Sequence, residues 1–532
     1  MKRNILFSLL YLLGSSHAYS QIKTLNYGAI DIQKYEFHIA VNDSSDEIKG
    51  EAIITLKTTA SLSSFILDLE NKDLFNKGMV IETVNRNDKA LRFEHANNKV
   101  VIFTEITTSN TEITFSIKYH GIPKDGLVIS KNKYGDRTFF GDNWPNRAHQ
   151  WLPTVDHPSD KALVEWHVTA PSHYQVIGNG TQQEETDLSD KNTLYVWKSE
   201  VPIPTKVMVI GIARFAVQHI GETHNIPISS WVYPQNKKEG FYDYALAKDV
   251  INFFIENVGP YPYSKLANVQ SKTRFGGMEN ASNIFYFENS VSGERKIENL
   301  IAHEIAHQWF GNSATESGWE HIWLSEGFAT YFTNLYVLET KGKDALDNLL
   351  IKQRNKVIEF YKKQYTPVID KTSTDLMKLL NANSYQKGGW ILHMLRKKLG
   401  DAVFWKGIRT YYKKFALKNA STNDLKQVFE EVSGKKLGVF FTQWLEKAGH
   451  PSLKTTWKQS RNKVKYKILQ IQKSDNIFTF PIELKIAYED GTTEITSVSV
   501  LDKKSSFLLA VKSKVKEISM DPNCWLLFEK VD

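Results

Sequence analysis

The chain has 532 residues, of which 41% are hydrophobic and 12% aromatic, which is the composition of a well-buried globular protein and excludes a disordered one. This length is too great for a single core and predicts about three or four domains. The net charge of +8 comes from lysines and arginines scattered among nearly as many acidic residues. Because no basic block or nucleic-acid motif occurs, we expect a solvated basic surface and no nucleic-acid partner.

The N-terminal segment has the pattern of a secretory signal peptide. Two basic residues precede an apolar run over 5–13, and small residues follow it. We predict a signal peptide over 1–20, cleaved after Ala18 or Ser20, and export to the periplasm or the medium. The run is short for a membrane span and no later segment reaches that length, so we expect no integral membrane anchor. With Cys524 as the only cysteine, no intrachain disulfide can form and stability must come from the cores.

The region that follows has the residue pattern of β-strands. Apolar residues alternate with polar ones or cluster with β-branched residues between polar turns. The clearest predicted strands are 35–39, 51–56, 111–117, 164–168 and 207–211. No convincing helical periodicity occurs before about residue 215. We predict an all-β domain over 21–221.

From residue 222 the periodicity becomes helical, and it returns to strands after residue 450. Helical spacing is clear at 244–257, 344–361, 386–399, 402–415 and 424–432. Strand patterns follow at 465–469, 480–486 and 496–500. We predict an α-rich domain over 222–450 with a small sheet, and a C-terminal β-sandwich over 451–532. The fold class is therefore multidomain α+β.

One stretch of the helical region, 297–326, carries a metal-binding pattern. His303 and His307 are four positions apart in a helical stretch, so both imidazoles project from one face and can share a metal. Glu304 stands next to the first ligand, where it can act on a metal-bound water. Glu326 lies 19 positions after His307, a gap that suits a second helix returning to face the first. Two histidines and one carboxylate form a hydrolytic zinc set with an open fourth position, although an isolated HExxH also occurs in ordinary helices.

Three motifs in a fixed order carry a family resemblance. Gly276-Gly277-Met278-Glu279-Asn280 comes first, with its glutamate 24 positions ahead of His303. HEIAHQWFGN at 303–312 and WLSEGFATYF at 323–332 follow. In this order they resemble the M1 family of zinc aminopeptidases, gluzincins with a thermolysin-like catalytic domain. The resemblance is strong over about 240–450, looser in the flanking β regions, and implies a short member with an N-terminal β-saddle domain, the catalytic domain and a C-terminal β-sandwich.

The resemblance implies a zinc-dependent peptidase mechanism. His303, His307 and Glu326 are expected to bind one Zn²⁺ per chain, which activates a water and polarises the scissile carbonyl. Glu304 is expected to act as the general base. Tyr385 matches the family tyrosine that donates a hydrogen bond to the tetrahedral oxyanion.

The first motif is expected to bind the substrate. Glu279 would bind the free α-ammonium, because a buried carboxylate rewards a charged amine and penalises an internal peptide bond. Gly276 and Gly277 would let an extended peptide lie against bare backbone, and Met278 and Asn280 complete the motif. The expected substrates are therefore peptides with a free N-terminus, and the expected activity is a secreted metallo-aminopeptidase.

Two positions depart from the family pattern, and the first of them keeps a different substrate class open. The family commonly has a Gln or Glu in the β domain as a second amine ligand, and here Trp144 falls near that place. Either Asp142 or Asn143 substitutes, or this anchor is missing. Gln386 stands where the family usually has Glu after the tyrosine. The alternatives are an endopeptidase or epoxide hydrolase with the same zinc site, and a secreted binding module without catalysis.

Three further histidines of the β region, His149, His157 and His167, resemble additional metal ligands. Scattered histidines in such a domain are usually surface or packing residues, and we interpret them in this way. In the zinc-helix motif we interpret Trp309 as a core residue and Asn312 as a group that supports the ligands.

Overall fold

The computed structural model describes residues 29–531, so the predicted signal peptide over 1–20 lies outside the described residues. The chain divides into two compact units. The first comprises residues up to Ala245 together with Tyr263–Lys296, and the second comprises Leu246–Pro262 together with residues from Ile297 onward. The domain boundaries at 221 and 450 stay predictions. Between residues 29 and 531, no helix has the length and apolar character that crossing a membrane requires.

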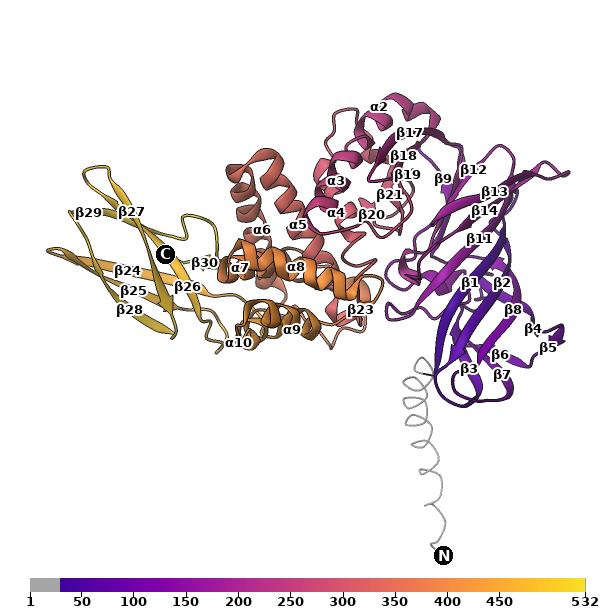
Figure 1. Cartoon of the computed structure of the whole chain (residues 1–532), viewed down its shortest axis with the longest axis horizontal. Coiled ribbons are helices and arrows are strands. Elements are labelled where there is room, and N and C mark those ends of the chain that lie inside the picture. Colours follow the sequence, from indigo (N-terminus) through magenta and orange to yellow (C-terminus); the bar gives the residue numbers. More distant parts are fainter. Residues whose placement is uncertain (1–28, 532) are drawn as a thin grey trace, which may run out of the picture. The chain divides into compact units, whose positions relative to one another are not determined.

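The first unit is built on a large, mostly antiparallel sheet (Figure 1). Its strands in spatial order are β13 (Thr181–Asp187), β14 (Asn192–Lys198), β11 (Lys161–Pro171), β1 (Ile30–Ala40), β2 (Ile48–Thr58), β8 (Glu112–Ile122), β4 (Gly78–Arg86) and β5 (Lys89–Ala90), with β15 (Ile203–Pro204) paired to β11. Burial alternates along β2 and β11, which places one face of the sheet on the core. Strands β1 and β11 pair in parallel.

Smaller sheets complete the β-rich part of this unit. Their strands are β12 (Gln175–Gly178), β16 (Ile210–Ala213), β10 (Arg137–Gly141) and β9 (Leu127–Lys131) in one, and β3 (Leu62–Asp68), β7 (Lys99–Thr107) and β6 (Phe93–Ala96) in the other. No α-helix occurs between residues 29 and 215, so the prediction of a β-rich N-terminal region is confirmed. The strand predicted at 207–211 begins only at Ile210, because Met208 closes a 3₁₀ turn by donating its N–H to Thr205.

A further sheet of the first unit carries the GGMEN motif. It consists of β17 (Ala216–Thr223), β18 (Ile226–Val232), β19 (Leu266–Ser271), β21 (Asn283–Phe287) and β20 (Gly277–Met278), in this spatial order, with α2 (Lys237–Tyr244) beside β18. Strands β18, β19 and β21 are parallel, and β20 pairs antiparallel with β21. Strand β20 is therefore an edge strand.

The second unit contains the other α-helices of the described residues. They are α3 (Ala247–Asn257), α4 (Glu298–His307), α5 (Trp323–Lys341), α6 (Lys343–Lys363), α7 (Gly388–Leu399), α8 (Asp401–Phe415), α9 (Thr422–Ser433) and α10 (Gly438–Phe441), with a short ladder between β22 (Thr315–Glu316) and β23 (Asn419–Ala420). The predicted helical region is confirmed. The helix predicted over 244–257 differs, because α2 ends at Tyr244 and α3 begins at Ala247.

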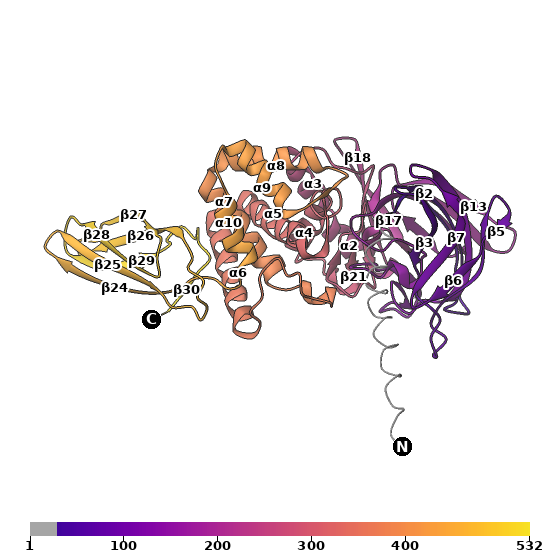
Figure 2. The same cartoon turned by 90° about the horizontal axis from the view of Figure 1, so that it is seen from below.

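Helix α5 is the central element of this unit. Its residues 323–337 are all buried, and it contacts α4, α6 and α7 (Figures 1 and 2). A helix that is apolar or buried on every side requires neighbours around its whole circumference. This position makes α5 a fixed support for any side chain that it carries.

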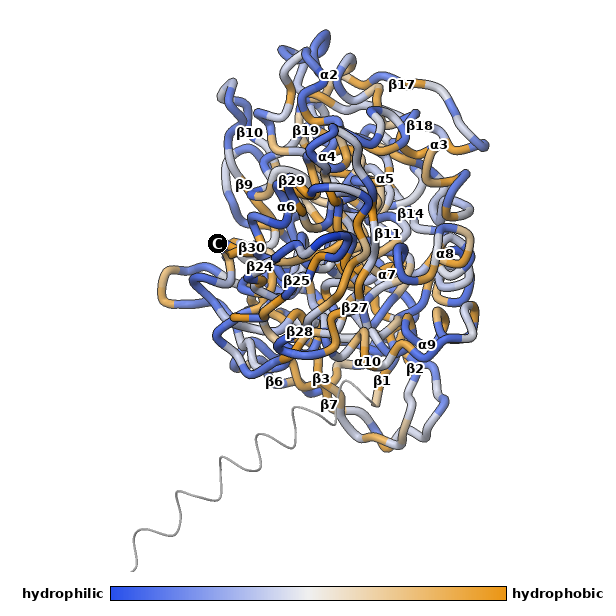
Figure 3. Tube along the Cα trace, turned by 90° about the vertical axis from the view of Figure 1, so that its left-hand side faces the viewer, coloured by the Kyte–Doolittle hydropathy of each residue, from blue (hydrophilic) through white to orange (hydrophobic). Residues whose placement is uncertain are grey.

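After Pro451 the described chain forms two sheets. One contains β28 (Lys504–Ala510), β25 (Lys463–Gln470), β24 (Ser452–Ser460) and β30 (Glu529–Lys530), and the other contains β27 (Thr493–Val500), β26 (Phe480–Tyr488) and β29 (Val515–Met520). Every second residue of β25 and β26 is buried. Figure 3 colours the chain by hydropathy and shows hydrophilic and hydrophobic residues interspersed along the tube.

Helices α5 and α7 approach each other at two glycines. A Cβ atom added to Gly327 would lie 2.8 Å from the Cα atom of Gly388, and a Cβ atom on Gly388 would lie equally close to Gly327. Only residues without a side chain allow two backbones to come this near. The contact holds the start of α7 against the start of α5.

Replacing Gly388 with alanine is expected to force these helices apart. Overpacking of this kind typically lowers the free energy of unfolding by about 1–3 kcal/mol. The matched control is Gly438→Ala, where an added Cβ meets nothing within 4 Å. Thermal and denaturant unfolding of both variants would check this, and equal stability of the two would contradict the close helix contact.

Candidate active site

Helix α4 brings the two predicted histidine ligands together. The Nε2 atoms of His303 and His307 lie 3.2 Å apart, and their rings are nearly perpendicular. His307 is fully buried and His303 is partly exposed, so one side of the pair opens outward. Glu304, between them in sequence, is buried. The predicted helix therefore places two imidazoles and one carboxylate on consecutive turns.

Helix α5 supplies the third predicted ligand. The Oε2 atom of Glu326 lies 3.5 Å from His303 Nε2 and 3.3 Å from His307 Nε2. With the 3.2 Å between the two nitrogens, the three atoms form a nearly equilateral triangle. Ligand atoms of a tetrahedral zinc ion, with bonds of about 2.1 Å, stand about 3.4 Å apart. The residues present fit a zinc ion.

The electrostatics of Glu326 agree with this fit. Burial alone would raise the pKa of its carboxyl, but the adjacent His307 and His303 hold that pKa well below its usual range. Its buried Oε2 atom accepts no hydrogen bond from the described residues. A buried, ionised and unbonded oxygen is costly unless a cation binds it.

Hydrogen bonds fix the orientation of His307. Its Nδ1 atom lies 3.2 Å from the carbonyl oxygen of Phe310 and 3.0 Å from Ser325 Oγ. Because a carbonyl oxygen can only accept, Nδ1 carries the proton and Nε2 keeps its lone pair for a metal. Gly311, with φ +114°, makes room for this contact, since a Cβ there would lie 2.2 Å from Ser325 Oγ. The sequence pattern did not indicate Ser325 or Gly311, and the glycine just after the helix was the available signal.

Tyr385 lies beside the histidine pair. It belongs to a π-helical turn, Asn383–Lys387, that leads directly into α7. Its ring is stacked on that of His303 with 5.9 Å between centroids and 12° between planes. The structure thus brings the predicted oxyanion donor next to a predicted ligand.

A buried lysine holds this turn in place. Lys387 Nζ donates to the hydroxyl oxygen of Tyr361 and to the carbonyl oxygen of Gly449, both at 2.9 Å. Burial lowers the pKa of Lys387 to about 7. The Tyr361 hydroxyl also bonds Asn383 Oδ1 at 2.5 Å, so both ends of the turn share one network. The sequence did not indicate that Lys387 holds this turn in place. Its position two residues after Tyr385 was the available signal.

The GGMEN motif lies in the first unit, on the edge strand β20 and the loop after it. Gly277 pairs with Tyr286 and Met278 pairs with Phe285, which leaves the other edge of β20 unpaired within its sheet. Gly276 is exposed, whereas Glu279 is only 5% exposed. Asn280 is fully buried.

Two buried side chains fix the ends of this motif. Asp142 accepts hydrogen bonds from the backbone N–H of Arg274 at 3.2 Å and from Arg147 at 2.7 Å. Burial raises the pKa of Asp142, against the pull of these two arginines. Asn179 donates to the carbonyl oxygen of Ala281 at 2.7 Å. The sequence did not indicate Asn179, because its partner is distant in the chain.

The residues considered as a second amine ligand have structural contacts. Trp144 is buried and packs edge-on against Phe275, with 6.1 Å between centroids. Asn143 donates to the carbonyl oxygen of Met208 at 2.5 Å and accepts from the Trp151 indole at 2.9 Å. Asn143 thus uses both its donor and its acceptor on the protein itself.

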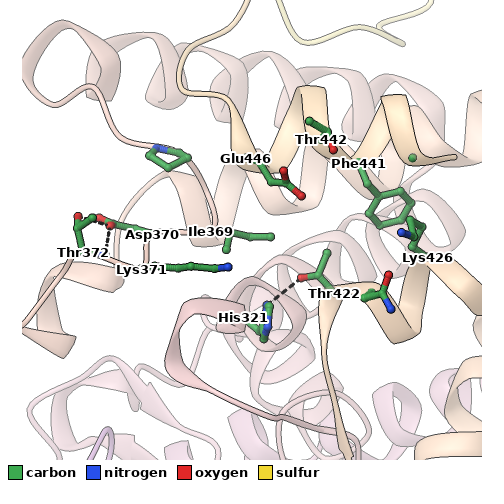
Figure 4. A pocket seen from close by; sticks show the side chains of 13 residues that line it. His321, Ile369, Asp370, Lys371, Thr372, Thr422, Lys426, Phe441, Thr442 and Glu446 are labelled. Atoms are coloured by element: carbon green, nitrogen blue, oxygen red, sulfur yellow. Dashed lines mark hydrogen bonds between the residues drawn. The ribbon is translucent and has the colours of Figure 1, made fainter.

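A cavity in the second unit does not include the predicted chemistry. Figure 4 shows this hollow, of about 510 Å³, between the segments 367–372, 422–426 and 438–446 and His321. Lysine and carboxylate side chains line it together, and His321 lies 3.1 Å from Thr422 Oγ1. None of its lining residues is a predicted zinc ligand, Glu304 or Tyr385. This cavity is therefore separate from the predicted zinc site.

Comparison with known proteins agrees with the motifs. The family model described as "Peptidase M1 N-terminal domain" matches residues 32–207, and "Peptidase family M1 domain" matches residues 242–444. A glutamyl aminopeptidase of Bitis rhinoceros is 28% identical over 421 residues, covering 74% of this chain and 44% of the relative. An aminopeptidase A of Gloydius brevicauda is 26% identical, covering 80% and 49%. A leucyl aminopeptidase of Saccharolobus solfataricus is 24% identical, covering 80% and 55%. The chain spans about half the length of these relatives.

Lys387→Met is expected to change how stability depends on pH. The pKa of Lys387 is about 7 in the folded protein and 10.5 in its ordinary state, so between these values the unfolded chain binds more protons than the native one. This lysine therefore makes stability rise with pH from about 7 to about 10.5, and below that window its charged form opposes folding.

The measurement is the unfolding midpoint at several pH values in that window for parent and variant. The variant should lose part of the rise seen in the parent. Lys378→Met is the control, because this lysine is exposed at the surface. Parallel pH curves for parent and Lys387→Met would contradict the buried, weakly basic lysine.

Proposed function

The chain belongs to the M1 family of peptidases, and on that basis we propose that it is a zinc-dependent aminopeptidase that removes N-terminal residues from peptides. The observation that carries this proposal is the triangle of His303, His307 and Glu326 with sides of 3.2–3.5 Å. The Oε2 atom of Glu326 is buried without a hydrogen bond, which favours a bound cation over a cluster of polar side chains packed together.

In the proposed mechanism each residue has a separate task. The three ligands would hold Zn²⁺, which when bound supplies a Lewis acid that polarises the scissile carbonyl and acidifies water. Glu304 takes the proton of the attacking water and delivers it to the leaving amine. Tyr385 donates its phenolic proton as a hydrogen bond to the oxyanion, because a phenol keeps that proton at neutral pH.

Substrate selection is assigned to the GGMEN motif. Glu279 would bind the α-ammonium of the first substrate residue, and the free edge of β20 would pair with the extended peptide backbone. The burial of Glu279 supports this role, because a buried carboxylate favours a cationic N-terminus over an acylated one. Peptides with a free N-terminus are therefore the proposed substrates.

The finer features of the fold and the location are proposals of the same kind. We assign a thermolysin-like catalytic domain to 222–450 and a β-sandwich to 451–532. The two C-terminal sheets with alternating burial support the sandwich. The basic, apolar and small residues over 1–20 support export.

Glu304→Gln is expected to abolish turnover and leave the metal bound, because Glu304 is a base and not a ligand in this mechanism. Loss of a general base typically lowers kcat by roughly 10²–10⁴-fold. Hydrolysis of amino-acid arylamides and the zinc content of the purified protein measure the two properties separately.

Glu298→Gln is the matched control. Glu298 is the first residue of α4, the helix that carries Glu304, and it forms an ion pair with Lys341 of α5. This variant should keep both zinc and activity. Full turnover in Glu304→Gln would sink the assignment of the base.

A short peptide with a free N-terminus should be cleaved, and its acetylated form should not, because acetylation removes the charge that Glu279 would bind. Addition of a chelator should stop the reaction. Glu279→Gln should lower kcat/KM for the free peptide and reduce the discrimination between the two forms.

The other outcomes separate the alternatives. Chelator-sensitive cleavage of both peptides would favour an endopeptidase, in which the region near Trp144 does not select the N-terminus. Cleavage of neither peptide by a protein that contains zinc would favour a binding module. Discrimination that stays unchanged in Glu279→Gln would remove this residue from the amine site.

A further inference from the structure

The large sheet of the first unit carries a second histidine–carboxylate cluster. Strand β1 contains Glu36-Phe37-His38, and strand β11 contains Glu165-Trp166-His167. The strands pair in parallel, with Glu36 opposite Glu165 and His38 opposite His167. The aromatic residues between them are fully buried and packed together, so both glutamates and both histidines lie on the other face.

The distances within this cluster are short. The two imidazole rings are stacked with 4.2 Å between centroids and 14° between planes. His38 Nε2 lies 3.0 Å from Glu36 Oε1, and His167 Nε2 lies 2.9 Å from Glu165 Oε1 and 3.8 Å from Glu36 Oε1. The ligand atoms of Glu36, His38 and His167 all lie within 4.8 Å of one another.

A lysine holds the two carboxylates in this arrangement. Lys34 Nζ lies 2.8 Å from the Oε2 atoms of both Glu36 and Glu165, whereas Lys198 reaches Glu165 Oε2 only at 3.9 Å. Each carboxylate therefore bonds lysine through one oxygen and turns the other toward an imidazole.

Both histidines remain open to solvent. The side chain of His38 is 41% exposed and that of His167 is 21% exposed. A shallow hollow of about 280 Å³ adjoins them, lined also by Tyr119 of β8 and Glu51 of β2. This hollow has room for water molecules that would complete the coordination of an ion.

We propose that Glu36, His38 and His167 form a second metal site, separate from the triangle of α4 and α5, which binds a divalent transition ion such as Zn²⁺. Two imidazoles and a carboxylate favour zinc, copper or nickel over calcium and magnesium, which prefer oxygen ligands. Glu165 Oε1, which lies 2.9 Å from His167 Nε2, adds a second carboxylate at the edge of this site. Because the ligands come from strands far apart in the chain, a bound ion cross-links β1 to β11 and stabilises the sheet.

The test uses the metal itself. The full chain is loaded with ZnCl₂, dialysed and assayed for zinc per chain, and the affinity is measured by calorimetric titration. We expect two equivalents in the parent and one in His167→Gln, with affinity for the lost equivalent weakened by roughly 100-fold or more. Zinc should also raise the unfolding midpoint of the parent more than that of the variant.

The matched control is His120→Gln on strand β8 of the same sheet. His120 Nδ1 lies 2.7 Å from Glu82 Oε1, and within residues 29–531 no group of three metal-binding side chains includes His120. This variant should retain both equivalents. Circular dichroism of all variants checks that each is folded, and replacement of the half-exposed His38 by Gln provides a second, independent variant.

The result does not depend on the proposed peptidase function. His303→Gln should lose the equivalent at the α4–α5 triangle and keep the one on the sheet. Equal zinc content and an equal zinc-dependent shift of the midpoint in parent, His167→Gln and His38→Gln would overturn the second site, whatever the outcome of the peptide assays.

Discussion

The Nε2 atoms of His303 and His307 and the Oε2 atom of Glu326 lie close together in the second unit. The surrounding helices hold these three electron-pair donors in place. Two imidazole nitrogens and one buried carboxylate oxygen lie within 3.5 Å of each other without a hydrogen bond on that oxygen. Burying the carboxylate oxygen in this way is costly without a cation, so rigid neighbours must hold the three atoms together. These neighbours are the buried helix α5, the carbonyl of Phe310 and the hydroxyl of Ser325.

The sequence predicted those parts of the site that depend on local periodicity. The spacing of His303 and His307 indicated a shared helix face, and the helices around them were confirmed with shifts of a few residues at their ends. The residues that position the site were not predictable in this way. Ser325 contacts His307 and Lys387 contacts Gly449 across distances that only the packed helices define. Asn179 is a further case, because its role depends on a loop 102 positions away.

The paired strands β1 and β11 also show that the sequence pattern does not reveal contacts between distant segments. The sequence contains Glu-x-His at 36–38 and again at 165–167, and alternation correctly indicated that both strands have one buried face. What it did not indicate is that the strands are neighbours, in parallel and in register. An interpretation of His167 as an isolated surface residue follows naturally from the sequence, and the register is what brings His38 beside it.

The backbone contact between Gly327 and Gly388 links the positions of two residues with proposed roles, Glu326 and Tyr385. Glu326 immediately precedes one glycine, and Tyr385 stands three positions before the other. No side chain separates the two backbones here. We therefore expect α5 and α7 to be rigidly packed against each other at this point. We therefore expect a displacement of the backbone at Glu326, the proposed ligand, to affect the position of Tyr385 as well. If the proposed roles hold, sequence changes near this contact should alter metal affinity and oxyanion stabilisation together, and altering only one of them should require changes elsewhere.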